Sequence, residues 1–430
     1  MYYNIGLTID KLFFWLGLIF VVISFTLCWF PNHFVFDESF HDYDIERYYK
    51  FPISIASIKE HYNPNGILSH ILPAIFAKII GSKDIIVIRL FVWLCVLGSF
   101  VLLSFKRFSN DTLKLGFLIT ICNPYSFLCS STYMTEFISL SFVIFGFIFI
   151  QSENNYKKNI GYLVIGLSIV TRLYYLALIP AIFLPELLRI NSLTAFKRVF
   201  KENILPFILI ISPLVFLILL WNGLTPPTLL EKGGEISEVS LNLPRFVVAC
   251  IYIGFYSIPF LYFSLRPKEY ELFRKPIYAI LILACSIIIL LLLPNIFNLV
   301  DRPINTGIIF SIYKVYLSNN SFLGFSYNLI IVFISLFSLS LLVSFVFKNS
   351  FTQNRSQLIA VFFILFFLLQ QLFVGGNIAF YERYILTSSF FLGIIFALGK
   401  NEKLNFGFAI SIFILFIISF IKALSVHQLI

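Results

Sequence analysis

The residues best suited to chemistry stand in the segment FDESFHDYDIERYYKF, residues 36–51, which follows a long apolar run directly. Asp37 and Glu38 are adjacent carboxylates, and the aromatic residues Phe36 and Phe40 flank them. Burial beside an apolar surface raises the pKa of a carboxyl group, and a more basic carboxylate can accept a proton from a hydroxyl group. The pair therefore predicts general-base chemistry. Asp37 is the first candidate base, and Glu38 is either the second candidate or a partner that positions Asp37.

The same segment also has a plainer interpretation, which is a solvated acidic loop. Asp42 and Asp44 would then lie in water, and their replacement by Asn would cost little. Carboxylates this close to an apolar run would repel anionic lipids unless they are paired or functional. This favours the functional interpretation for Asp37 and Glu38.

Further polar candidates stand at the ends of other apolar runs: His41, Glu136, Arg172, Tyr381 and Arg383. An arginine at the bilayer centre costs ~2.5–3.5 kcal/mol, so we expect Arg172 at a turn near the membrane surface. Structural roles are the alternative: a carboxylate at a helix N-terminus for Glu136, and belt residues at the membrane interface for tyrosine and arginine.

The composition indicates the solvent around these residues. The chain has 430 residues, of which 59% are hydrophobic and 12% charged, and its mean hydropathy is +0.93. Soluble domains carry about a quarter charged residues, so the bilayer is the main solvent here. The net charge of +10 comes from short Lys and Arg clusters between apolar runs, which is typical of orientation signals and does not predict nucleic-acid binding. The six cysteines form no C-x-x-C or Cys/His cluster, so the sequence predicts neither a metal site nor a disulfide framework.

Apolar runs follow one another along the chain at 12–30, 85–105, 112–129, 133–151, 160–184, 204–221, 245–265, 277–299, 324–347, 356–374, 384–399 and 405–424. The sequence TRLYY interrupts the run 160–184, which predicts two spans that meet at a turn. The fold class is therefore an all-α polytopic membrane protein with about 13 transmembrane helices. Residues 66–80 form a shorter run that contains Ser, His, Pro and Lys, and they predict a juxtamembrane helix at the outer surface.

The basic residues predict the orientation. Lys and Arg occur in every segment that is cytoplasmic if the N-terminus is cytoplasmic and residues 66–80 do not cross. The positive-inside rule then places residues 31–84, which we call the first loop, on the outer face. The same alternation places the other candidate residues on that face too.

Five features follow in order over residues 10–190: the acidic DE after the first span, the NPNG step at 63–66, the short helix ILSHILPAIFAKIIG, the turn NPYSFLCSSTYMTEF and the TR turn at 171–172. In this order the chain resembles the GT-C superfamily of membrane glycosyltransferases that use polyprenyl- or dolichyl-phosphate sugars. Protein O-mannosyltransferases, the bacterial aminoarabinose transferase and dolichyl-phosphate-glucose-dependent glucosyltransferases belong to it. The resemblance implies a GT-C-type catalytic module at 1–190 and a variable membrane module at 191–430, joined as one membrane domain.

The resemblance also implies an activity and roles for the candidate residues. A polyprenyl-phosphate-linked sugar would be the donor, and a glycan or lipid-linked molecule the acceptor, as in O-antigen or surface polysaccharide modification. Asp37 would be the base of an inverting transfer, and Arg172 and Arg383 would bind the donor phosphate. His41, Glu136 and Tyr381 would contact substrate. The expected location is a bacterial inner membrane with the active site facing the periplasm. No cofactor is implied, and a divalent metal is compatible with this chemistry but not indicated.

Two other classes of membrane protein stay open. A Wzy-like O-antigen or polysaccharide polymerase usually relies on large outer loops that carry arginines, whereas the outer loops 222–243 and 300–323 are modest and contain few basic residues. A polysaccharide transporter or flippase would be expected to have polar residues deep in several spans and internal repeats, and the sequence shows almost none.

Overall fold

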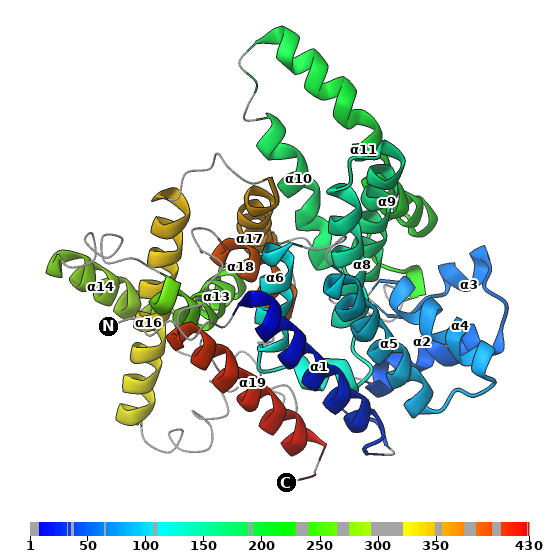
Figure 1. Cartoon of the computed structure of the whole chain (residues 1–430), viewed down its shortest axis with the longest axis horizontal. Helices are drawn as coiled ribbons and strands as arrows, with labels where there is room; N and C mark the ends of the chain where they lie inside the picture. The colour runs from blue at the N-terminus through cyan, green and yellow to red at the C-terminus, as the bar shows by residue number, and fades with distance from the viewer. Residues whose placement is uncertain are drawn as a thin grey trace.

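A computed structural model of the chain describes residues 8–31, 33–35, 38–63, 66–105, 110–187, 190, 192–228, 240–264, 275–293, 321–348, 355–373, 384–397, 406–427 and 429. Within these ranges the regular secondary structure is helical, without a β-strand (Figure 1). The helices are α1 Ile9–Cys28, α2 Glu38–Lys50, α3 Ile55–Lys59, α4 Leu68–Ile80, α5 Ile85–Ser104, α6 Asp111–Ile121, α7 Ser126–Ser131, α8 Thr135–Ile150, α9 Asn155–Thr171, the 3₁₀-helix η1 Leu173–Ala177, α10 Leu178–Leu187, α11 Leu193–Trp221, α13 Leu243–Ser264, α14 Pro276–Leu292, α16 Ser321–Lys348, α17 Arg355–Phe373, α18 Ile385–Phe396 and α19 Phe406–Val426.

Seven of the described helices are long and apolar enough to cross a membrane: α1, α5, α11, α13, α16, α17 and α19. Shorter apolar helices of 10–17 residues lie at 68–80, 135–150, 173–187, 276–292 and 385–396. The prediction of an all-α fold is confirmed over the described residues, and the seven apolar helices are consistent with the predicted multi-pass membrane protein. The described residues contain seven such helices, so the predicted number of about 13 spans is not confirmed.

Two breaks divide apolar runs. The prediction of a turn within 160–184 is confirmed, because α9 ends at Thr171 and Arg172 adopts an extended backbone before η1 begins. The prediction of one helix over 112–129 is wrong, because α6 ends at Ile121 and α7 begins only at Ser126. The intervening Asn123-Pro124 explains the break, since the residue before a proline is disfavoured in the helical conformation.

The first loop folds into short helices on one side of the molecule, next to α5 (Figure 1). Most of the acidic segment is not an irregular loop, because residues 38–50 form α2. Helices α2 and α4 have 13 residues each, or about 20 Å, whereas the hydrocarbon core is about 30 Å thick. Neither helix is long enough to cross it along the normal, as the sequence predicts for residues 66–80.

Polar contacts between helix ends fall into two sets. On the side of the first loop, three contacts involve the loop itself: α5 with residues 30–33, the α7–α8 turn with α2, and the end of α11 with α3. Three more lie on the same side: α8 with Arg172, α13 with α17, and His427, which follows α19, with α7. On the opposite side, they join the start of α6 to the start of α1, and the ends of α8 and α10 to the start of α17. Each contact joins helix ends that the alternation of Lys and Arg assigns to the same face. The candidate residues that the structure describes, Glu38, His41, Glu136 and Arg172, therefore lie in the set that includes the first loop.

Candidate functional site

Three of the residues predicted for the site lie outside the described residues: Asp37, Tyr381 and Arg383. The other four are Glu38, His41, Glu136 and Arg172, and all of them are buried. The structure brings them together in two groups. Glu38 and His41 belong to the first loop, whereas Glu136 and Arg172 lie where α8 begins and α9 ends.

Glu38, the first residue of α2, forms a buried ion pair with Arg89 of α5. Arg89 donates from Nε to Oε1 at 2.8 Å and from Nη2 to Oε2 at 2.6 Å, and both side chains are 0% exposed. The guanidinium group also donates to the backbone oxygens of Phe30, Pro31 and His33. Bidentate ion pairs of this type are among the stronger polar contacts in proteins. Arg89 thus fastens the start of the first loop to α5.

The hydrogen-bonding capacity of the Glu38 carboxylate is filled. Besides Arg89, Oε2 accepts a hydrogen bond from the backbone N–H of Val35 at 2.7 Å, and Oε1 accepts one from that of Tyr133 at 2.6 Å. Two bonds at each oxygen use the lone pairs that an ionised carboxylate offers. Of the two roles predicted for Glu38, this geometry fits positioning better than proton acceptance. The sequence did not predict Arg89, although a lone arginine in an apolar run is a signal for a buried carboxylate partner.

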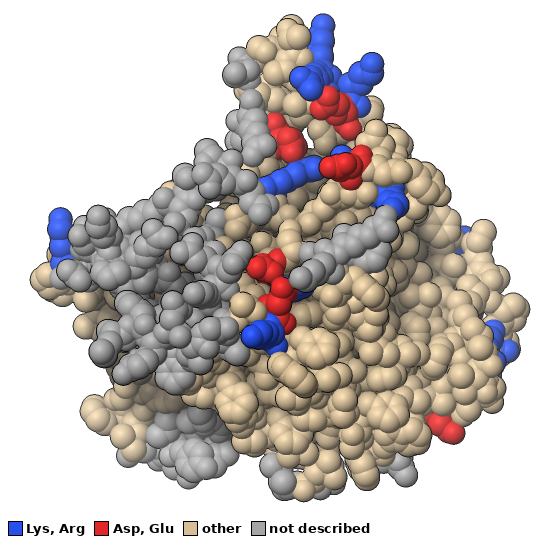
Figure 2. All heavy atoms as spheres, viewed as in Figure 1, with Lys and Arg blue, Asp and Glu red and all other residues tan. Residues whose placement is uncertain are grey.

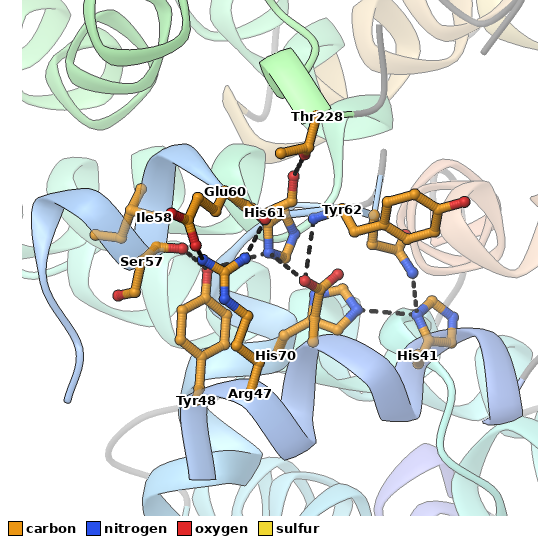
Figure 3. Close-up of polar contacts among 12 residues, drawn as sticks. His41, Arg47, Tyr48, Ser57, Ile58, Glu60, His61, Tyr62, His70 and Thr228 are labelled. Carbon is orange, nitrogen blue, oxygen red and sulfur yellow. Dashed lines mark hydrogen bonds and ion pairs between the residues drawn. The ribbon is translucent and has the colours of Figure 1, made fainter. Parts of the chain in front are cut away.

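Three histidines of the first loop lie together in its interior (Figure 3), and His41, His61 and His70 are each at most 3% exposed. His41 Nδ1 lies 3.0 Å from His70 Nε2, and the His61 and His70 rings are 4.9 Å apart between centroids. His70 Nδ1 lies 3.1 Å from Ser69 Oγ, whose hydroxyl donates to the Gly66 carbonyl. These partners assign the proton of His70 to Nδ1. His70 Nε2 then faces His41 Nδ1, which also lies 3.0 Å from the amide nitrogen of Asn63. Burial keeps the pKa of His70 well below 6.5, which fits this neutral form.

Asp44 is a second buried carboxylate of α2. Its Oδ1 accepts a hydrogen bond from the Tyr62 N–H at 3.0 Å and lies 3.4 Å from His61 Nδ1, which in turn contacts the Tyr48 hydroxyl at 3.1 Å. Its Oδ2 finds no hydrogen-bond donor among the described residues. Burial raises the pKa of Asp44 to about 6, although backbone hydrogen bonds and Arg47 act in the opposite direction. The interpretation of Asp44 as a solvated residue is therefore wrong.

The spacing of these residues explains why α2 buries them together. Glu38, His41, Asp44, Ile45 and Tyr48 are its buried residues, and they follow one another at intervals of one to three positions. Positions 38, 41, 45 and 48 repeat at steps of three or four, which places them on one helix face. The polar face of α2 thus points into the protein. This spacing was available in the sequence as a signal for a polar helix face, but not for its burial.

The histidine cluster does not form a metal centre. Among the described residues, no group of three or more His, Cys, Asp or Glu side chains is arranged to hold a metal ion. The nitrogens of His41 and His70 that face each other share a hydrogen bond at 3.0 Å, so they are engaged with one another. The cluster instead fixes the fold of the first loop through neutral and charge-assisted hydrogen bonds.

Arg172 is the centre of the second group. Its Nη2 lies 3.0 Å from Glu136 Oε1, and its Nη1 donates to Thr135 Oγ1. The guanidinium carbon is 5.2 Å from the ring centroid of Tyr174 and 5.3 Å from that of Tyr384, within the range of cation–π contacts. Arg172 is 5% exposed. Glu136 and Arg172, predicted separately, are therefore partners at the same helix ends.

A second buried arginine, Arg245 of α13, meets the same tyrosine. Its Nη2 donates to the Tyr174 hydroxyl at 2.9 Å and its Nε to Gln371 Oε1 of α17 at 2.9 Å. Tyr174 thus contacts two guanidinium groups, one over its ring and one at its hydroxyl. Burial of a charge is unfavourable without a nearby opposite charge, and Glu136 supplies one to Arg172. The sequence did not predict Arg245, although an arginine in the first turn of an apolar helix at the predicted outer face was a signal for it.

The turn between α7 and α8 connects the two groups. The backbone N–H of Tyr133 donates to Glu38, and the ring of Tyr133 meets the His41 ring edge-to-face at 5.3 Å between centroids. Two residues further along, Thr135 accepts a hydrogen bond from Arg172. A shift of this short turn would therefore displace contacts in both groups, the hydrogen bond to Glu38 and the hydrogen bond from Arg172.

An apolar pocket lies between the first loop and the ends of α9 and α11, and Gly66, Val170, Leu173, Leu217 and Trp221 are part of its lining. Val170 and Leu173 lie close to Arg172 in the chain on either side of it. Gly66 contacts the end of α9 so closely that a Cβ there would lie 1.9 Å from the Val170 carbonyl oxygen. The glycine of the NPNG step thus allows the first loop to pack directly beside the Arg172 group.

Comparisons with known proteins give no relative: no protein-family model, no curated protein and no solved structure matches this chain. The described residues form a helical structure with seven candidate membrane-spanning helices and buried charged groups at one set of helix ends. The function has to be argued from those groups.

Proposed function

We propose that this protein is an integral membrane glycosyltransferase that moves a sugar from a polyprenyl-phosphate donor to a hydroxyl group of a glycan or lipid-linked acceptor. The observation that carries the proposal is the pair of buried arginines, Arg172 and Arg245, that share Tyr174. Two guanidinium groups at the ends of apolar helices, of which Arg172 is paired with the Glu136 carboxylate, suit a phosphate group attached to a lipid.

The chemistry of the donor requires such a site. The bond between the anomeric carbon and the phosphate oxygen breaks, and a phosphate monoester with a second pKa of about 6 departs. It leaves near neutral pH without a general acid, but its negative charge increases and needs stabilisation by cationic donors. Arg172 has a donor for this purpose, because its buried Nε finds no acceptor among the described residues. Glu136 would hold the guanidinium plane in place from the other side.

The acceptor hydroxyl must lose its proton on the opposite face of the sugar. Asp37 is the proposed base, and direct displacement would invert the anomeric configuration. Glu38 would act as its positioning neighbour, because four hydrogen bonds hold the Glu38 carboxylate against α5 and the α7–α8 turn. The same turn contacts Arg172, so the base and the phosphate site would share one rigid support.

The surroundings of the site support a lipid-linked donor. The residues before and after Arg172 in the chain, Val170 and Leu173, are apolar and line a small pocket, so the surroundings of the site are apolar. Ile75, Ile79 and Ile80 of α4 are exposed, as expected of a helix that lies in the membrane surface. These features fit the GT-C type with about 13 spans that the sequence suggests. They also fit a site on the periplasmic face of a bacterial inner membrane that modifies O-antigen or another surface polysaccharide.

The test is sugar transfer by the purified full-length protein in nanodiscs, with a panel of polyprenyl-phosphate sugars and acceptors. Arg172→Lys keeps the charge but loses the planar fork. A hydrogen bond to a charged group contributes about 1.5–3 kcal/mol, so we expect transfer to fall about tenfold to 150-fold, together with weaker binding of polyprenyl phosphate. The matched control is Arg198→Lys, an exposed position on α11, which should transfer sugar at the wild-type rate.

Other outcomes would point elsewhere. Wild-type turnover and donor affinity in Arg172→Lys would remove this residue from the donor site. Extension of a lipid-linked oligosaccharide without a monosaccharide donor would favour the polymerase. Movement of a lipid-linked glycan across the bilayer without any transfer would favour the flippase.

A further inference from the structure

The first part of α11, residues 193–204, extends from the body of the molecule and carries a group of basic side chains (Figures 1 and 2). Helix α11 has 29 residues, or about 44 Å, which exceeds the hydrocarbon thickness of about 30 Å. About nine residues therefore lie beyond the hydrocarbon if the helix crosses it near the normal. No residue from 192 to 205 is buried, so no other described helix covers this segment.

This segment is amphipathic. Leu193, Phe196, Phe200 and Ile204 follow one another at steps of three and four, so they share one face, and they are 72%, 45%, 58% and 43% exposed. Large apolar side chains with this exposure form a contiguous strip that needs a partner.

Basic side chains line the border of the apolar strip. Lys197 follows Phe196 and Lys201 follows Phe200, so each lysine is offset from the apolar strip by about 100° around the helix. The two lysines are four positions apart and share one face. Arg198 forms an ion pair with Glu202 at 3.0 Å on the side away from the strip. The two lysines at the border are thus in position to meet an anion that approaches together with an apolar surface.

We propose that residues 193–204 dock onto anionic phospholipids, with Phe196 and Phe200 at the boundary of the acyl chains and Lys197 and Lys201 on the lipid phosphates. The segment continues a helix that is long and apolar enough to cross a membrane, so its first turns emerge among the headgroups. The charge selects the lipid, because cationic residues near a membrane surface favour anionic headgroups. This surface lies on the side opposite the first loop, and the inference does not depend on the proposed enzymatic activity.

The expected size of the effect follows from the charges. Each Lys near an anionic surface contributes about 1 kcal/mol, or about fivefold in the equilibrium between docked and free states. Replacement of both lysines by Gln should therefore reduce docking about thirtyfold. The effect should disappear in about 1 M salt, where the Debye length falls to about 3 Å.

The experiment is hydrogen–deuterium exchange of the full-length protein in nanodiscs of pure phosphatidylcholine and in nanodiscs that also contain phosphatidylglycerol. We expect the amides of 193–203 to exchange more slowly with the anionic lipid, and Lys197→Gln/Lys201→Gln to lose this difference. The matched control, Lys157→Gln/Lys158→Gln at the start of α9, removes the same charge from another helix. This control should keep the difference in exchange of residues 193–203 between neutral and anionic nanodiscs. Unchanged exchange in α1 of each variant would show that the fold is intact.

Two results would overturn the proposal. One is equal exchange of 193–203 in neutral and anionic nanodiscs. The other is protection that rises with protein concentration and ignores the lipid, which would assign the strip to a second copy of the chain.

Discussion

Replacement of Glu38 by Gln is the change that best separates a positioning carboxylate from a catalytic one. The two roles predict different losses. A carboxylate that only holds Arg89 in place, in what we call the Glu38–Arg89 clamp, stabilises the folded state, so its loss lowers stability. A catalytic base stabilises the transition state, so its loss lowers the rate of transfer. The structure makes the first loss calculable. Glu38 and Arg89 are both 0% exposed, and four hydrogen bonds converge on the two carboxylate oxygens.

The magnitude follows from these bonds. An amide nitrogen placed at Oε2 would face two donors, Arg89 Nη2 and the Val35 N–H, and one placed at Oε1 would face Arg89 Nε and the Tyr133 N–H. Two hydrogen bonds are therefore lost in either orientation, and Arg89 keeps a buried charge without its counter-ion. Removing one partner of a buried ion pair costs about 3–5 kcal/mol. We expect Glu38→Gln to lower the free energy of unfolding by this amount.

Reversible unfolding in mixed detergent micelles, measured beside sugar transfer, is the assay. Glu46→Gln on the same helix is the matched control, because Glu46 pairs with Lys50 and Lys83 at the surface and should cost less than about 1 kcal/mol. Arg89→Met should be as damaging as Glu38→Gln, whereas the double variant Glu38→Leu/Arg89→Met removes both charges and should recover part of the loss. If Glu38→Gln is as stable as the control but transfers sugar about 10²–10⁴-fold more slowly, Glu38 is the base and the positioning role is refuted.

Two further predictions concern the first loop. The folded pKa of Asp44, about 6, lies above its ordinary value of 3.8, so its contribution to stability falls as the pH rises from about 4 to about 7. The free energy of unfolding of Asp44→Asn, measured relative to the wild type, should therefore rise by about 2–3 kcal/mol between these pH values. A difference that does not vary with pH would contradict the burial of a charged Asp44. Gly66→Ala should fail to fold or lose several kcal/mol, because its Cβ would overlap the Val170 carbonyl oxygen, whereas Gly223→Ala, with open space around its Cβ position, should melt like the wild type.

The parts of the fold that the sequence predicted correctly depend on local signals. The turn at Arg172 was predictable because an arginine inside an apolar run is costly in a bilayer, and α9 does end one residue before it. The short helix α4 was predictable because its run is too short and too polar for a span. The break between α6 and α7 was missed although it follows the same kind of local rule, at Asn123-Pro124.

The contacts within the site depend on long-range pairing, which one sequence does not reveal. Glu38 and Arg89 are 51 positions apart, and the residues around each of them do not indicate which partner it has. The burial of Asp44 was missed for a different reason. Helical periodicity shows that α2 has a polar face, but it does not show whether that face meets water or a second polar surface such as His61 and His70.

The connection through the α7–α8 turn affects how any loss of activity must be interpreted. Glu38 holds the backbone of Tyr133, and Thr135, two residues later, accepts a hydrogen bond from Arg172. Weakening the clamp would therefore displace the proposed phosphate site as well as the proposed base. A catalytic defect in a Glu38 variant is consequently ambiguous alone, since both groups change together. Arg172→Lys does not touch the clamp, so a variant that keeps wild-type stability and loses donor binding assigns the phosphate site independently of which carboxylate accepts the proton.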